Sequence, residues 1–113
     1  MNKTKDKVIV FNSEYVGRGD DTLGFEITIT LLDALIERDD RPKAMIFLNT
    51  SVMLLVEGSP AFPRLKTLEK KGVQILAGKL CLNNLCISDT IVGKPSSMDE
   101  ILDLLLHNDV ITL

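Results

Sequence analysis

Cys81 is the residue of this sequence whose position most favours chemistry. It follows the apolar residues 73–77, a predicted buried strand, and in open α/β sheets the segments after the strands form the ligand crevice. Lys79 lies two residues before the sulfur, and a helix is expected to begin nearby. A cation and a helix start both stabilise the thiolate, which is the reactive form of a cysteine. The alternative is that Cys81 is a small buried hydrophobic residue, as many free cysteines are.

Cys86 and His107 carry the other thiol and the imidazole of the chain. Cys86 lies five residues after Cys81, a rotation of about 140° on one helix, so we expect the two sulfurs not to face each other. We expect Cys86 to be buried beside Leu85 and Ile87, with a redox role as the alternative. His107 is expected near a helix C-terminus, where the helix dipole favours a cation. These residues do not form a zinc pattern, so we expect no metal and no cofactor.

The composition is that of an ordinary globular chain. A length of 113 residues predicts one domain over 1–113, large enough to fold without disulfides or metal. Aromatic residues make up 4% and the net charge is −3, so the stacking platform and basic groove of a nucleic-acid-binding protein are missing. No segment approaches the roughly 20 apolar residues of a membrane span. The start of the chain is basic, but the apolar run behind it is too short for a signal peptide. We therefore expect a cytoplasmic protein with reduced thiols.

Hydrophobic periodicity predicts strands that alternate with helices. Strands are expected at residues 7–11, 43–48, 73–77, 90–92 and 109–113; helices at 22–38, 63–71 and 82–87; and one or two helical turns at 52–56. A last helix should begin at a capping box formed by Ser97 and Glu100 and run to about His107. Residues 22–38 also alternate like a strand, but they are too long for one, and Asp20 or Asp21 can cap a helix there. This order predicts an α/β fold: a three-layer Rossmann-like sandwich around a mainly parallel sheet of about five strands.

Polar segments follow the predicted strands at residues 12–13 with 17–20, at 49–51, at Cys81 and at 93–94. The carboxyl ends of parallel strands meet at one edge of a sheet, so we expect these segments to lie together. The alternative is that they are ordinary connections, which every α/β sheet needs.

Four residues of these segments are candidate binding residues: Ser13, Arg18, Asn49 and Lys79. The Asn49 amide could help to hold a small anion or a persulfide, or it could simply cap the following turn. The loop around Arg18 is not expected to bind phosphate, because Thr22 stands where a dinucleotide motif has its third glycine. A tight turn and a helix cap are the expected roles of that loop.

The ordered set of motifs resembles the DsrE-like family over nearly the whole chain from Lys7 onward. It is most similar to the DsrE-type half of the YedF proteins, which are called sulfurtransferase-like and are linked to selenium metabolism. The resemblance implies a Rossmann-like three-layer fold, assembly into small oligomers, and sulfur relay through a persulfide at the position of Cys81. The motifs are Asn12-Ser13, Gly17-Arg18-Gly19-Asp20, Leu23-Gly24, Pro42-Lys43, Phe47-Leu48-Asn49, Val52, Glu57-Gly58-Ser59, Gly72-Val73, Cys81-Leu82, Val92-Gly93 and Met98-Asp99.

The sequence departs from the YedF pattern in two ways. That pattern tends to read Cys-Gly-Thr-Cys-Leu, whereas residues 77–82 here read Ala-Gly-Lys-Leu-Cys-Leu, so the first cysteine is Ala77. The 113 residues also do not include the TusA-like domain that precedes this half in YedF, so a TusA-like carrier or another thiol protein is expected from a separate chain if these residues form a complete protein.

Two functions follow as hypotheses. The first is a sulfurtransferase-like protein that carries sulfane sulfur on Cys81 in an intracellular sulfur or selenium relay. The alternative is a non-catalytic oligomeric binding or regulatory module of the same fold, which the loss of one family cysteine favours. A homo-oligomer is expected from the resemblance and from the apolar residues 52–56, although that run can instead be core.

Overall fold

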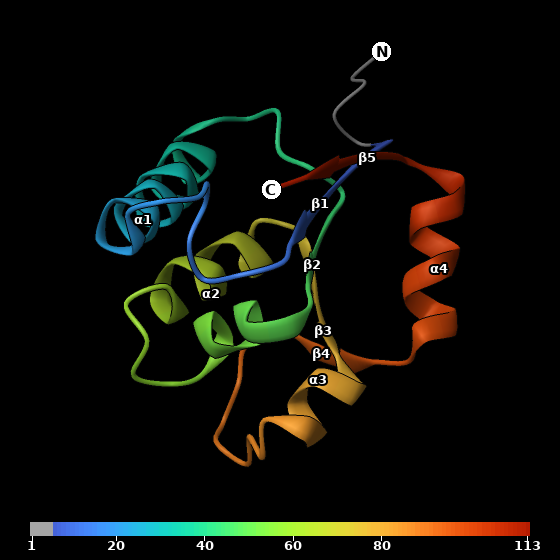
Figure 1. Ribbon diagram of the computed structural model, residues 1–113. Helices are drawn as coiled ribbons and strands as arrows, with labels where there is room; N and C mark the ends of the chain where they lie inside the picture. Colours follow the sequence, from blue (N-terminus) through green and yellow to red (C-terminus); the bar gives the residue numbers. More distant parts are fainter. Residues whose placement is uncertain (1–5) are drawn as a thin grey trace.

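The computed structural model describes residues 6–113 and has three layers, with a sheet between helices (Figure 1). Over these residues the sheet has the strand order β4-β3-β2-β1-β5, and every pair is parallel. The strands are β1 (Lys7–Phe11), β2 (Ala44–Phe47), β3 (Gln74–Gly78), β4 (Lys94–Ser96) and β5 (Asp109–Thr112). The predicted α/β fold with a parallel sheet is thus confirmed. Most of the basic start of the chain, which the signal-peptide argument concerned, lies outside the described residues.

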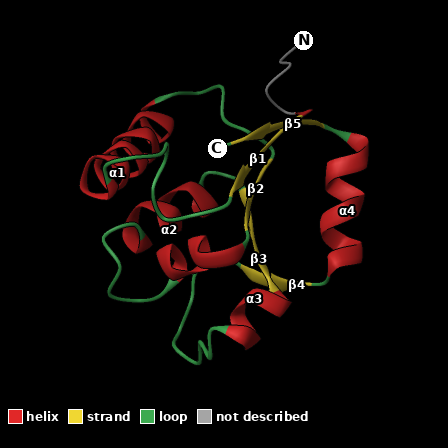
Figure 2. Ribbon diagram, viewed as in Figure 1, coloured by secondary structure: helices red, strands yellow, loops and turns green. Residues whose placement is uncertain are grey.

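Helices cover both faces of the sheet. They are α1 (Asp21–Glu37), the 3-10 helix η2 (Asn49–Leu55), α2 (Phe62–Lys70), α3 (Lys79–Asn84) and α4 (Met98–His107). Figure 2 shows α4 on one face and α1 with α2 on the other. The long segment 22–38 is therefore a helix, as predicted, and the Asp20 side chain caps it by accepting the Leu23 N–H at 3.0 Å.

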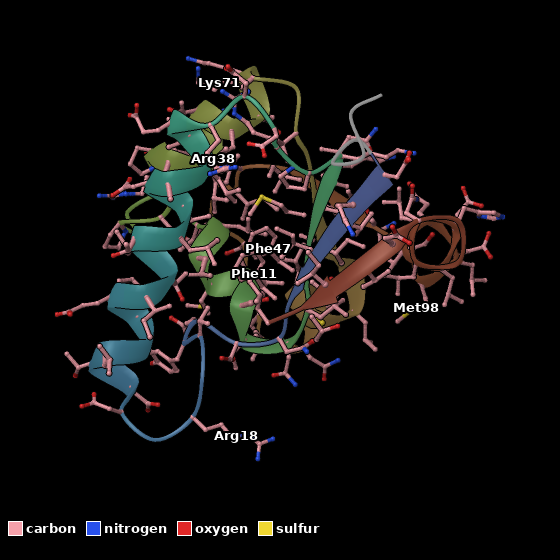
Figure 3. The ribbon with its side chains drawn as sticks, turned by 90° about the horizontal axis from the view of Figure 1, so that it is seen from above. Phe11, Arg18, Arg38, Phe47, Lys71 and Met98 are labelled. Carbon is pink, nitrogen blue, oxygen red and sulfur yellow. The ribbon has the colours of Figure 1, made fainter. Side chains whose placement is uncertain are left out.

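The core is divided by the sheet into two parts, because successive strand residues point to opposite faces. On the side of α1 and α2, the rings of Phe11 and Phe47 stack with centroids 4.9 Å apart (Figure 3). On the side of α4, Ile46 and Val8 pack against Ile101, and all three are nearly inaccessible to solvent. Strands that are buried on both faces of a parallel sheet must be apolar throughout, which is the pattern of β2 and of residues 8–11 in β1.

The fourth strand is not at residues 90–92, as predicted, but at Lys94–Ser96. Residues 90–92 pair instead with the end of η2 and the residues that follow it: the Val92 N–H donates to the Leu55 carbonyl at 2.9 Å, and the Thr90 carbonyl accepts from the Glu57 N–H at 2.8 Å. The strand that does join the sheet contains Pro95, which an edge strand tolerates because one of its sides has no partner. Residues 93–94 thus lie at the start of a strand, so the expectation that they accompany Cys81 at the carboxyl edge is wrong.

The apolar residues 52–56 belong mostly to the core. Val52, Leu54 and Leu55 are inaccessible to solvent, and Met53 is 39% exposed. This run therefore offers little surface for contact between copies of the chain, and the homo-oligomer stays a prediction.

The capping box at the start of α4 is present as predicted. Ser97 Oγ accepts the Glu100 N–H at 3.2 Å, and Glu100 Oε1 accepts the Ser97 N–H at 3.1 Å. The other carboxylate oxygen of Glu100 accepts from Lys94 Nζ at 2.7 Å. The hydrogen bond from Lys94, followed by that from the Ser97 backbone, lowers the pKa of Glu100 from 4.5 to about 2.

This lowered pKa predicts a contribution to acid stability. Because the folded-state pKa lies below the unfolded value, Glu100 stabilises the fold above pH 4.5 and loses this effect as the pH falls toward about 2. We expect Glu100→Gln to lower stability at neutral pH and to flatten its decline across that window. Urea unfolding at a series of pH values measures this, with Glu69→Gln on the exposed side of α2 as the control. An unchanged decline in Glu100→Gln would contradict the prediction.

Candidate functional site

Cys81 lies in the first turn of α3, at the carboxyl end of β3. Gly78 ends the strand and is also the N-cap residue of the helix, with an extended backbone (φ −61, ψ 117). The helix therefore begins at Lys79, earlier than the predicted start at Leu82, because no loop separates it from the strand. Cys81 is half-buried and packs against the core on the side of α1 and α2.

The Cys81 sulfur receives a hydrogen bond from a backbone N–H of another strand end. Asn49 begins η2 after β2, and its N–H donates to Cys81 Sγ over 3.1 Å. Asn49 has a φ of 55, in the left-handed region that asparagine adopts more readily than most side chains. Its Oδ1 accepts the Thr50 N–H at 2.8 Å, as the capping alternative predicted. Thus the backbone of Asn49 contacts the sulfur, while its side-chain oxygen binds the Thr50 N–H.

Gly78, which was not among the predicted site residues, also shapes the surroundings of the sulfur. A Cβ on Gly78 would lie 3.1 Å from Cys81 Sγ and 3.0 Å from Leu48 Cδ2. Such contacts are tighter than side chains normally make, so a glycine leaves the sulfur its space. The signal in the sequence was a glycine directly between an apolar strand and the cysteine helix.

The other predicted binding residues are not gathered around Cys81 by hydrogen bonds. Ser13 forms a local turn: its Oγ donates to the Tyr15 carbonyl at 2.7 Å and accepts the Tyr15 N–H at 3.0 Å. Arg18 is exposed and points away from the molecule in Figure 3. Lys79 is exposed at the first position of α3, so its charge lies on the same helical turn as Cys81.

Of the other two candidates, His107 lies where it was predicted and Cys86 does not. Cys86 was predicted to be buried, but it is exposed in the turn after α3, where its φ of 54 turns the chain out of the helix. His107 ends α4 as predicted, and its Nδ1 lies 2.7 Å from the Asp103 carbonyl oxygen. Within residues 6–113, no three acidic, cysteine or histidine side chains are grouped as metal ligands would be. None of the described helices has the length and apolar character needed to cross a membrane.

This arrangement can hold negative charge on sulfur. The Asn49 N–H is directed at Cys81 Sγ, and a hydrogen bond of this kind is stronger when its acceptor carries negative charge. Cys81 is half-buried, so part of the residue is accessible to solvent. Thiol-based sulfur transfer requires a stabilised thiolate and an accessible sulfur.

The fold defines an α/β protein of the three-layer, parallel-sheet class with a cysteine at the carboxyl edge of its sheet. Among solved structures, the chain is similar to the ychN protein of E. coli, with a TM-score of 0.71, 18% sequence identity, and coverage of 96% of this chain and 99% of that chain. YchN has a DsrE-like fold, so the fold expected from the sequence is confirmed. At this identity the likeness concerns the fold alone. No family model and no curated protein sequence matches the chain.

Proposed function

We propose that the protein is a sulfur carrier that holds sulfane sulfur as a persulfide on Cys81, in an intracellular sulfur or selenium relay. The observation that carries this proposal is the hydrogen bond from the Asn49 N–H to Cys81 Sγ, at the carboxyl edge of a DsrE-like sheet. The exposed ammonium of Lys79, on the same turn as the sulfur, favours the approach of an anionic persulfide donor.

The proposed step conserves atoms and electrons. The Cys81 thiolate attacks the outer sulfur of a donor persulfide, a new S–S bond forms at Cys81, and the donor leaves as its thiolate. The Cys81 persulfide then gives its outer sulfur to an acceptor thiol in the same way. The acceptor we propose is a TusA-like carrier or another protein thiol. No oxidant, metal or cofactor enters this exchange.

The proposal predicts which cysteine gains sulfur, and mass spectrometry of the intact protein measures this. After incubation with a sulfane-sulfur donor, each added sulfur increases the mass by about 32 Da. We expect Cys86→Ser to gain this mass as the parent protein does, and Cys81→Ser to lose nearly all of it. Cys86→Ser is the matched control, because it removes the other thiol of the chain, which is more exposed.

Two outcomes would overturn the proposal. If Cys81→Ser acquires as much label as the parent protein, Cys81 is not the carrier. If neither thiol takes up sulfur while the protein is folded, the non-catalytic binding module of the same fold is the better description, with Cys81 as a packing residue of α3.

A further inference from the structure

The outer side of α1 carries an apolar groove away from the sheet. The α1 groove has a volume of about 430 Å³, and it is lined by Leu23, Glu26, Ile27, Thr30, Leu31 and Ala34. Leu23 is 53% exposed and Ile27 is 39% exposed, whereas the residues that α1 buries are Gly24, Thr28 and Leu32. The helix is therefore apolar on two sides, and only one of them meets the core.

The spacing in the groove suits a second helix. Leu23, Ile27, Thr30 and Ala34 are separated by steps of four, three and four residues. This is the spacing of the seam along which two helices pack side by side. At about 1.5 Å per residue, the seam is roughly 16 Å long, or three turns.

The charge along α1 has one sign. The helix contains Asp21, Glu26, Asp33 and Glu37 and no lysine or arginine. Glu26 and Asp33 lie one residue before Ile27 and Ala34, so they border the seam where coiled coils carry their flanking charges.

Three arginines that contact α1 or follow it directly are already bound. Arg64 Nε lies 2.7 Å from Asp33 Oδ1, and Arg38 Nε lies 2.7 Å from Asp40 Oδ1. Arg41 donates to the Leu35 carbonyl at the end of the helix. Asp33 is thus paired, whereas Glu26, which lines the α1 groove, forms no ion pair among the described residues, so the border keeps a negative charge at Glu26.

We propose that the α1 groove binds a helix of a partner protein that is apolar along one side and carries lysine or arginine beside it. Such a helix would place its apolar side on Leu23 and Ile27 and its basic flank opposite Glu26. Charge complementarity selects this occupant, because the apolar seam has only acidic residues of its own helix beside it.

In the part that the structure describes, the helices of a second copy match the groove less well. Another α1 would bring its own acids against Glu26, and α3, which exposes Leu80 beside Lys79, has only six residues against a seam of about three turns. Helix α4 exposes Leu102 and Leu106, but its charged residues beside them are Asp99 and Asp103, which would face the acids of α1. Helix α2 exposes lysines but no large apolar side chain. The groove therefore fits a foreign basic helix better than another copy.

A pair of designed peptides tests this inference. The probe is a labelled helical peptide of about 18 residues with leucine along the seam and lysine on its flanks, and its twin has glutamate in place of lysine. Fluorescence anisotropy is measured with the full chain at low and high salt. We expect the lysine peptide to bind at least about tenfold more tightly than its twin, and this preference to shrink in high salt.

Matched variants locate the binding surface. Ile27→Ser should weaken binding of the lysine peptide about tenfold, and Glu26→Lys should reverse the preference between the two peptides. Leu102→Ser on α4 is the control, because Leu102 is 42% exposed and Ile27 is 39% exposed, on opposite faces of the sheet. Circular dichroism confirms that each variant is folded.

Three results would overturn the inference: equal binding of both peptides, equal weakening by Ile27→Ser and Leu102→Ser, or self-association of the chain that Ile27→Ser alone abolishes. The last result would identify a second copy as the occupant. The inference does not depend on sulfur transfer, and sulfur loading of Ile27→Ser should equal that of the parent protein. Failure of one proposal is therefore distinguishable from failure of the other.

Discussion

Replacing Gly93 by alanine is expected to destabilise the protein by about 3 kcal/mol or more, the combined cost of a left-handed alanine and an overpacked contact. Gly93 has a φ of 91 just before β4, and an added Cβ would lie 2.6 Å from Ile75 Cγ2 and 2.8 Å from the Ile75 carbonyl oxygen. The side chain could rotate away, but the carbonyl belongs to β3, which is held between β2 and β4. Relief of the contact therefore requires a shift of the sheet or of the start of β4.

Gly17→Ala is the matched control for this prediction. Gly17 has a φ of 90, yet an added Cβ there would meet no atom within 4 Å. It should cost only the backbone strain, about 1–2 kcal/mol. Urea unfolding gives the free energy of unfolding of each variant, and the two can be compared if their m values are equal. The difference between the two losses of stability is then the cost of the steric contact at Gly93. Equal destabilisation of the two variants would show that Gly93 is needed for its backbone angle alone.

Replacing Asn49 by valine is expected to slow the alkylation of Cys81 about tenfold, the effect of losing one hydrogen bond of about 1.4 kcal/mol to the attacking sulfur. A β-branched residue does not fit a φ of 55, so the backbone must move and its N–H must turn away from the sulfur. Asn49→Gly accepts the same φ and keeps the N–H, so it should react at nearly the parental rate.

The measurement is the rate of alkylation by iodoacetamide at neutral pH, made in a Cys86→Ser background so that only Cys81 contributes. Thermal unfolding of each variant shows whether the fold is retained. If Asn49→Val and Asn49→Gly react alike, the N–H of Asn49 does not govern the reactivity of the sulfur, and the observation behind the proposed function loses its force.

The elements that were predicted correctly from the sequence are those with a strong local pattern. The continuous apolar run of β1 and the capping box at Ser97 each specify their structure within a few residues. The strand β4 was missed because Lys-Pro-Ser has no apolar pattern, and its place at the edge of the sheet is set by its pairing with β3. Residues 90–92 are β-branched, as strand residues often are, but their backbone hydrogen bonds are made with Leu55 and Glu57 and not with a strand of the sheet.

The candidate site was predictable in its location and not in its contacts. Parallel strands bring Asn49 and Cys81 to the same edge, so their approach followed from the fold. That the donor is the backbone N–H depends on the left-handed conformation of Asn49, which residue types alone do not specify. Cys86 is exposed in the turn that follows the end of α3. Its apolar neighbours Leu85 and Ile87 suggested burial, but they do not show where the helix ends.

The pairing of β1 with β5 joins the two ends of the chain, and this affects how the sheet forms during synthesis on the ribosome. Lys7 is paired in register with Asp109, so about 100 residues of chain must be made between the two partners. At a synthesis rate of about 5–20 residues per second, roughly 5–20 s pass between the synthesis of β1 and that of β5. During that interval the edge of β1 that β5 later covers lacks its partner strand and can pair with other chains.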